Sequence, residues 1–281
     1  MRSLKAGLIA AVFAVAGATS ASAGPQFAVW LDGNTAAGGG GQGILTSLDN
    51  AFGAGSYQLI STAQLDTPGF LSSFKTVIVS RFGSSFGSSL SAASAANVHS
   101  YVGGPGAGQG GVAVFTNDAS DNLFGSVSGD PYDANLNALF INAVKFAAAS
   151  GHGYIGEFNG AIAALATNTA GFNSADLLVG NATGLHFYGP QFTYDIGTPG
   201  VGAAIYSGVT LPFTDSDSST YLTDITGFDT AQLVLQYTSS NINGEPAILA
   251  NSVIINGVPE PTALALFGFG VMGFALARRR R

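Results

Sequence analysis

Residues 153–161, Gly153-Tyr154-Ile155-Gly156-Glu157-Phe158-Asn159-Gly160-Ala161, place a strand, a tight turn and a helix in immediate succession. Tyr154-Ile155 is the expected strand, and an Ala-rich helix is expected from Ala161 to about Ala166. Gly156 and Gly160 suit a sharp strand-to-helix turn, because such a turn leaves no room for Cβ atoms. Strands and helices in alternation are typical of parallel sheets.

The chain before this turn alternates strands and helices in the same way. Strands are expected at 27–31, 57–60, 76–80 and 111–116, and helices at 44–52 and 91–102. The clearest helix is expected to begin at Asp130-Pro131, with Asp130 as the N-cap and Pro131 at the first helical position. Its apolar residues between Leu136 and Ala147 follow helical spacing, and Gly151 is expected to close it.

The pattern changes after Ala175, where short β-rich pieces are separated by Gly, Pro and Asp. They are Leu177–Val179, Leu185–Tyr188, Val201–Tyr206, Ala231–Tyr237 and Ala247–Ile255. We therefore predict an α/β fold, a mainly parallel sheet with helices on both faces. Its α/β core spans 25–170, and a β-rich extension, 171–257, adds strands to the sheet edge and a smaller β layer.

The turn Gly156-Glu157-Phe158-Asn159-Gly160 resembles the nucleophile elbow of class I glutamine amidotransferase-like proteins, which have a flavodoxin-like fold. In that family Gly-x-Cys-x-Gly ends a strand and opens a helix, and the resemblance extends over the element order of residues 25–166. Phe158 occupies the nucleophile position, and the chain contains no cysteine. A phenyl ring has no nucleophilicity, so amidotransferase chemistry is excluded and the elbow is expected to be degenerate.

The first 23 residues have the composition of a secretory signal peptide. Arg2 and Lys5 precede an apolar run, and the small residues Ala21-Ser22-Ala23 offer a cleavage site before Gly24. The secreted domain that must fold is therefore expected to span 24–257.

The C-terminal residues combine three features in order. Val258-Pro259-Glu260-Pro261 is followed by the uncharged apolar run Thr262–Ala277 and then by Arg278-Arg279-Arg280-Arg281. As a helix the run would span about 24 Å, slightly less than a hydrocarbon core of about 30 Å. Arginines stay on the cytoplasmic side of a membrane. An ordinary membrane anchor is the alternative, although an anchor has no need of Pro-Glu-Pro.

This tripartite segment, 258–281, resembles the PEP-CTERM sorting signal of Gram-negative bacteria. The resemblance implies export by the Sec machinery and a precursor held in the inner membrane by a transmembrane helix at 262–277. It also implies cleavage near Pro-Glu-Pro by exosortase, followed by release to the cell surface or exterior. Proteins with this signal are associated with exopolysaccharide and biofilm matrix, which makes exopolysaccharide a candidate partner.

Outside the two targeting signals the chain has three basic residues, Lys75, Arg81 and Lys145, against fifteen acidic ones, a net charge of −12. Such a surface repels phosphate backbones and excludes nucleic acid as a partner, but it permits divalent cations or neutral glycans. Without cysteine the core must hold without disulfides.

Single residues suggest two kinds of site, an acid–base site and a calcium site. Glu157 and His152 could do acid–base work if a pocket buried them; otherwise His152 is a cation at a helix C-terminus and Glu157 a hydrogen-bonded turn residue. The acidic residues that could offer oxygen ligands to calcium are Asp118, Asp121, Asp215 and Asp217. Caps and turns explain those carboxylates equally well, and no cofactor is expected.

Three functions follow. The main hypothesis is a secreted, noncatalytic surface or matrix protein. The rival is an extracellular hydrolase that uses Glu157 with Asp or His partners at the C-terminal ends of the strands, where open α/β sheets bind ligands. A glycan-binding module with exposed Trp30 or Tyr residues is the third. A polar pocket at Asp32, Asn117 and Glu157 would favour the hydrolase.

Overall fold

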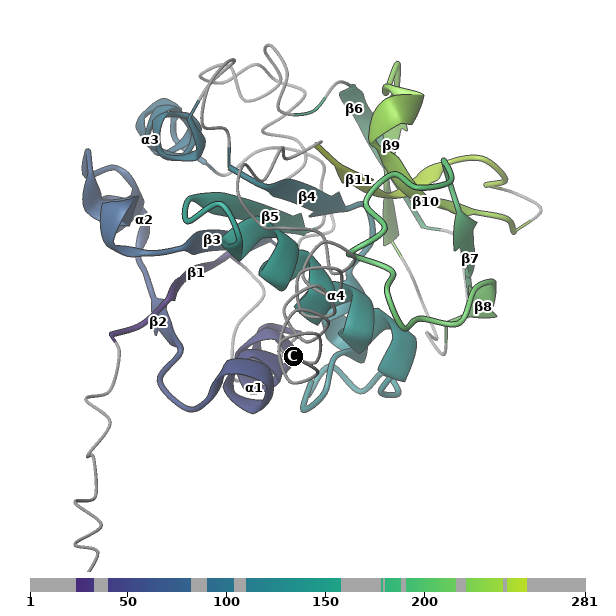
Figure 1. Cartoon of the computed structure of the whole chain (residues 1–281), viewed down its shortest axis with the longest axis horizontal. Coiled ribbons are helices and arrows are strands. Elements are labelled where there is room, and N and C mark those ends of the chain that lie inside the picture. Colours follow the sequence, from purple (N-terminus) through teal and green to yellow (C-terminus); the bar gives the residue numbers. More distant parts are fainter. Residues whose placement is uncertain are drawn as a thin grey trace, which may run out of the picture.

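The computed structural model describes residues 24–32, 40–81, 90–103, 110–157, 178, 180–187, 191–215, 221–239 and 242–251. This part of the chain forms a nine-stranded sheet in the order β2-β1-β3-β5-β4-β11-β10-β7-β8, and a separate two-stranded sheet, β6-β9 (Figure 1). The strands of the large sheet are β1 (Phe27–Asp32), β2 (Tyr57–Leu59), β3 (Thr76–Arg81), β4 (Val112–Phe115), β5 (Gly153–Glu157), β7 (Thr193–Ile196), β8 (Phe213–Thr214), β10 (Leu233–Tyr237) and β11 (Pro246–Ala250).

The first five strands are parallel. β1 pairs with β2 and β3, and β5 lies between β3 and β4 and is parallel to both. The parallel arrangement predicted for this part of the chain is therefore confirmed. Each of the first four, β1 to β4, is followed by at least one helix, because a chain that returns in the same direction needs a crossover connection.

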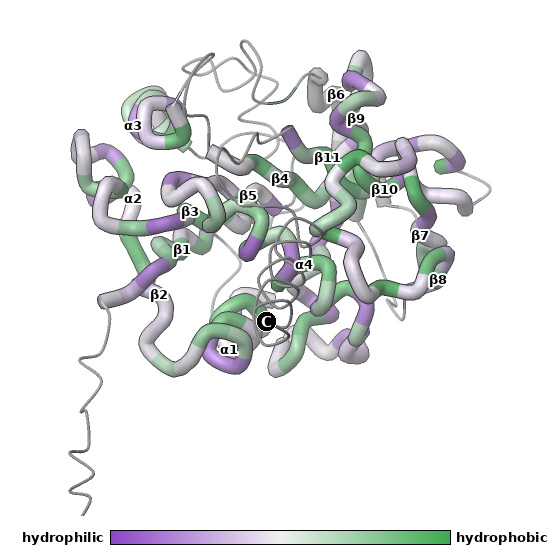
Figure 2. Tube along the Cα trace, in the orientation of Figure 1, coloured by the Kyte–Doolittle hydropathy of each residue, from purple (hydrophilic) through white to green (hydrophobic). Residues whose placement is uncertain are grey.

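The helices are α1 (Gly41–Phe52), α2 (Thr62–Leu65), α3 (Ala92–Val102) and α4 (Ala134–Ala148), with 3₁₀ turns η1 (Phe70–Ser73), η2 (Ala119–Asn122) and η4 (Thr230–Gln232). Successive strand residues point to opposite sides of the sheet, and they enter two buried clusters. Ile78 and Ile155 pack with residues of α1 and α4. Val77 and Tyr154 pack with residues of α2 and α3. Hydrophobic residues accordingly follow the central strands and α1 (Figure 2).

The later strands make the sheet mixed. β11 is antiparallel to β4, β10 to β11, β7 to β10 and β8 to β7. The second sheet pairs β6 (Asn181–Phe187) with β9 (Tyr221–Thr226) in antiparallel fashion. It joins the large sheet where Asn117 bridges Leu222 and where Thr223 N donates to Thr116 O at 2.9 Å.

The predicted start of α4 at Asp130-Pro131 is wrong. The N-cap is Asp133, whose Oδ1 accepts from the backbone N–H groups of residues 135 and 136 at 2.8 and 3.0 Å. Asp133 N donates to Asn122 O at 2.9 Å, and Asn122 Nδ2 donates to Pro131 O at 2.9 Å. These bonds to η2 occupy residues 131 and 133, so the helix starts one turn later.

The strand predicted at 201–206 is also wrong, since this segment forms consecutive turns. Ile205 N donates to Gly202 O at 2.7 Å and Val209 N to Tyr206 O at 3.1 Å. Gly202 has a φ of +57°, which glycine adopts readily and which a strand does not allow. Ile205 is nevertheless buried, so the apolar pattern reflected burial in a turn.

Several predicted features lie outside the described residues: the signal peptide 1–23, the elbow residues Phe158, Asn159 and Gly160, the helix at 161–166, Asp217 and the C-terminal segment 258–281. Among the residues that are described, no helix has the length and hydropathy needed to cross a bilayer.

Candidate functional site

Polar residues gather where the parallel strands end. β1 ends at Asp32, β3 reaches Ser80 and Arg81, β5 ends at Glu157, and Asn117 follows β4 closely. The strand register places Ser80 on one side of Glu157 and Phe115 on the other. This edge of an open α/β sheet is where ligands usually bind.

Glu157 is buried at this edge, with 2% of its surface exposed. Ser80 Oγ donates to Glu157 Oε2 at 2.5 Å, and the backbone N–H of Ser120 donates to Oε1 at 2.5 Å. The carboxylate therefore connects three segments: the ends of β5 and β3, and the η2 turn after β4. Burial raises the pKa of Glu157, and the bonds from Ser120 and Ser80 oppose that rise.

These contacts bear on what Glu157 can do chemically. A general acid or base has to come within hydrogen-bond distance of a substrate proton. Both oxygens of Glu157 instead receive protein donors, and Ser80, which donates to Oε2, is fully buried. The geometry thus supports a structural role, in which the carboxylate holds η2 against the sheet.

Sequence reasoning did not single out Ser80 or Ser120. Ser80 could have been found, because it is a polar residue at the end of the apolar run Thr76–Val79. Ser120 lies 37 residues before Glu157 in the chain, so no local sequence pattern links the two residues.

The start of α1 packs closely on η2. A Cβ atom added to Gly40 would lie 2.4 Å from Ser120 Oγ and 2.4 Å from Asp121 Oδ1, and one added to Gly43 would lie 2.7 Å from Ser120 O. Real Cβ atoms do not approach other atoms so closely, so glycine is required at both positions. Asp121 thereby sits at the N-terminal end of α1, where a carboxylate is electrostatically favourable.

A second buried polar network joins the end of β4 to the antiparallel strands. Asn117 Nδ2 donates to Tyr194 Oη at 2.9 Å, and Tyr194 Oη donates to Asp215 Oδ2 at 3.0 Å. Phe192 N donates to the other oxygen of Asp215 at 2.9 Å. Asn117 Oδ1 is buried and finds no hydrogen-bond partner among the described residues. The network ties β4 to β7 and uses Asp215 as an acceptor.

Three of the four carboxylates considered for calcium, Asp118, Asp121 and Asp215, lie in the described part of the chain. Across the described ranges, no group of three or more His, Asp or Glu side chains comes together as a metal ion requires. Asp215 belongs to the Tyr194 network and Asp121 to the η2–α1 contact. Asp118 is buried beside η2, at 2% exposure.

The structure does not bring His152 and Glu157 together. His152 precedes β5 and Glu157 ends it, so five residue steps, about 16 Å of extended chain, separate them. They cannot form the acid–base pair considered from the sequence. His99 lies in the last turn of α3 with a buried Nε2.

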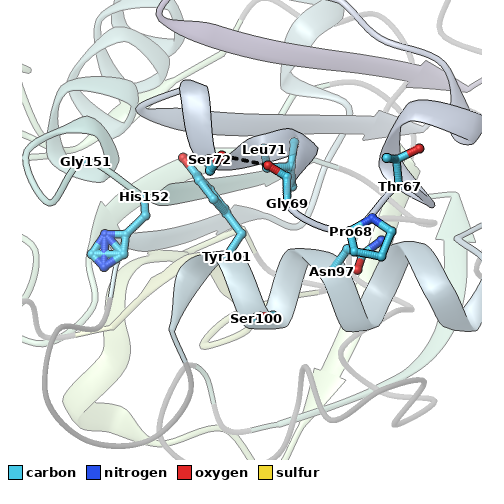
Figure 3. A pocket seen from close by; sticks show the side chains of 10 residues that line it. All are labelled: Thr67, Pro68, Gly69, Leu71, Ser72, Asn97, Ser100, Tyr101, Gly151 and His152. Atoms are coloured by element: carbon cyan, nitrogen blue, oxygen red, sulfur yellow. Dashed lines mark hydrogen bonds between the residues drawn. The ribbon is translucent and has the colours of Figure 1, made fainter.

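His152 instead lines a pocket of about 410 Å³ beside α3 and the loop before β3 (Figure 3). Burial lowers the pKa of His152. Tyr101 Oη donates to Phe74 O at 3.0 Å, Ser72 Oγ to Gly69 O at 2.7 Å, and Asn97 Nδ2 to Leu65 O at 2.8 Å. Much of the polar lining is thus engaged in holding the surrounding loop.

Trp30 is not an exposed platform for a sugar. It is 4% exposed, and its Nε1 donates to Thr62 Oγ1 at 3.2 Å. The form of the glycan-binding hypothesis that relied on Trp30 is therefore wrong.

Comparison with known proteins identifies the C-terminal segment. Residues 257–281 match the family model described as the PEP-CTERM protein-sorting motif. No curated protein and no solved structure matched the chain. The motif makes exosortase the processing partner and implies export to the cell envelope or surface: the chain carries an exosortase sorting signal.

Proposed function

We propose that this exported protein is a noncatalytic component of the cell surface or extracellular matrix. The sorting motif at 257–281 supports the location. The observation that carries the noncatalytic assignment is the pair of bonds that Glu157 accepts from Ser80 Oγ and Ser120 N. They occupy the carboxylate at the end of β5, an edge of the sheet where a catalytic group would act.

The proposal includes a processing route. After Sec export and removal of residues 1–23, the helix at 262–277 holds the precursor in the inner membrane until exosortase cleaves near Pro259-Glu260-Pro261. Exopolysaccharide is the proposed matrix partner. The net charge of −12 outside the targeting signals favours a neutral polymer over a polyanion.

The proposal also includes a relationship to class I glutamine amidotransferase-like proteins, with Phe158 in place of the nucleophilic cysteine. The interior position of β5, between the parallel strands β3 and β4, supports it. Gly156, near the end of β5, also supports it, because an elbow of this kind has no room for a Cβ atom at that position. A Cβ atom added to Gly156 would lie 2.8 Å from Cε1 of the Tyr154 ring and 3.0 Å from Val114 Cγ1.

A hydrolase assay tests the noncatalytic assignment. The protein purified from its host and a Glu157→Gln variant would be incubated with soluble β-glucan, galactomannan and casein, and new reducing ends and amino groups measured. We expect no turnover by either protein. A hydrolytic activity present in the native protein, and lost in a Glu157→Gln protein of unchanged melting temperature, would overturn the assignment.

Localisation experiments test the proposed location at the cell surface. Surface labelling of intact cells should label the mature protein, and cell fractionation should find little of it in the cytoplasm. A mature protein confined to the inner membrane in the presence of exosortase would contradict the surface role.

A further inference from the structure

An open groove lies along the neighbouring helices α1 and α4, away from Glu157. Its volume is about 420 Å³, within the range of small-ligand sites. The residues that line it and matter here are Asn50, Phe124, Tyr132, Asn137, Asn142 and Lys145. We call it the α1–α4 groove.

Two exposed aromatic rings form one wall of the groove. Phe124 is 46% exposed and Tyr132 51%, and with Val127 they make up three of the four large hydrophobic side chains exposed in the described chain. Their ring centroids are 5.6 Å apart and their planes meet at 87°, which is an edge-to-face contact. Each ring therefore restricts the orientation of the other. Exposed apolar surface bordered by polar groups marks an interaction site.

The structure holds two amides of α4 in defined orientations beside these rings. Asn137 Oδ1 accepts from Ser47 Oγ at 2.7 Å and from Phe124 N at 3.2 Å, which directs its Nδ2 donors elsewhere. Asn142 Nδ2 donates to Ile205 O at 3.1 Å and to Ser207 O at 2.9 Å, which leaves Oδ1 as the acceptor. The groove therefore presents an oriented donor and an oriented acceptor.

Exposed polar side chains complete the rim. Asn50 of α1 offers a further amide, and Lys145 of α4 offers an ammonium group. A ligand for this lining has one apolar face and several hydroxyl groups at its edge. A pyranose ring has that form, with C–H groups on its face and hydroxyls around it.

We infer that the α1–α4 groove binds a neutral glycan, with a pyranose stacked on Tyr132, the more exposed of the two rings, and its hydroxyls bonded to Asn137 Nδ2 and Asn142 Oδ1. The overall charge of −12 opposes a polyanion. The groove, with a volume of about 420 Å³, has the size of a site for one or two sugar rings. A stable protein–protein interface would instead cover about 800 Å² on each partner, a much larger surface. The inference rests on the proposed function in taking a neutral polysaccharide as the ligand, and it adds the site that would bind it.

Native affinity electrophoresis provides the test. The exported protein would be run in gels containing galactomannan, xyloglucan, soluble β-glucan or dextran, with polygalacturonate as the charged comparison. We expect at least one neutral polymer to retard it. Tyr132→Ala should weaken that binding at least about tenfold, while Tyr132→Phe, which keeps the ring, should stay within about threefold.

Leu59→Ala is the matched control, because Leu59 is 49% exposed and lies on β2, outside the groove. It should bind as the native protein does, and thermal melts should show that every variant is folded. The inference is overturned if no neutral polymer retards the protein, if only polygalacturonate does, or if Tyr132→Ala binds like the native protein.

Discussion

Ser120 donates its backbone N–H to Glu157 Oε1 at 2.5 Å, which joins the η2 turn after β4 to the end of β5. The other carboxylate oxygen accepts from Ser80 on β3. A buried carboxylate costs free energy unless donors compensate for its lost hydration. The two donors lie on β3 and in η2, which are distant from β5 in the sequence. These hydrogen bonds therefore form only when the tertiary structure brings the three segments together.

Removing the Glu157 carboxylate should therefore destabilise the protein. Glu157→Ala leaves the Ser120 N–H and the Ser80 hydroxyl without their acceptor, at a cost of about 2–4 kcal/mol. Glu157→Gln should cost within about 1 kcal/mol, because its amide oxygen can accept from Ser120 while its NH₂ donates to Ser80 Oγ. Urea unfolding of both variants measures this. Equal losses would show that the hydrogen bonds contribute little.

Glu157 should also make stability depend on pH. Its pKa is raised by burial above the ordinary value of about 4.3. As pH rises past that value, the unfolded chain loses the proton first, so the contribution of Glu157 to stability falls until the folded pKa is passed and then levels off. The native protein should thus lose stability relative to Glu157→Gln over this window. Unfolding free energies measured from about pH 4 to about pH 8 would contradict this if the difference stayed constant.

The start of α4 can be tested at its cap. Asp133→Ala should cost about 1 kcal/mol, because the N–H groups of residues 135 and 136 lose their acceptor. Asp133→Asn retains a capping oxygen and should cost only a few tenths. Chemical denaturation measures the free energy of unfolding of each variant. If Asp130→Ala lost more of it than Asp133→Ala, the N-cap would be Asp130, as the sequence predicted.

Gly43 should resist replacement although it lies inside α1. Helix propensity alone predicts that Gly43→Ala gains about 1 kcal/mol. The added Cβ would lie 2.7 Å from Ser120 O and 3.0 Å from Leu123 Cβ, so we expect a loss of about 1–3 kcal/mol instead. Asn50→Ala, at an exposed position of the same helix, should be neutral or stabilising. A stabilised Gly43→Ala protein would contradict the close packing of α1 on η2.

The sorting motif predicts a processing defect. Replacing Pro259, Glu260 and Pro261 by alanines should leave export intact but keep the precursor uncleaved in the inner membrane, because exosortase would lose its recognition sequence. Intact mass and cell fractionation measure this, with alanines at Ile254, Ile255 and Asn256 as the neighbouring control. Unchanged mature mass and location would show that the segment is a plain anchor.

Features that depend on residues close together in the chain were determined by the sequence itself. Apolar runs such as Thr76–Val79 predicted the strands, helical spacing predicted α1 and most of α4, and an Ala-rich stretch predicted α3. The tripartite pattern at 258–281 predicted the sorting motif. The absence of cysteine excluded thiolate chemistry. Each of these follows from local periodicity or composition, which the chain carries before it folds.

Features that depend on contacts between distant residues were decided by the tertiary structure. The bonds from residues 131–133 to Asn122 moved the start of α4, the bond to Thr62 and the surrounding core enclosed Trp30, and the length of β5 separated His152 from Glu157. A turn at 201–206 buries Ile205 as a strand would. The physical reason is the same in each case: burial and hydrogen-bond partners depend on which segments meet in space, and sequence spacing does not record that.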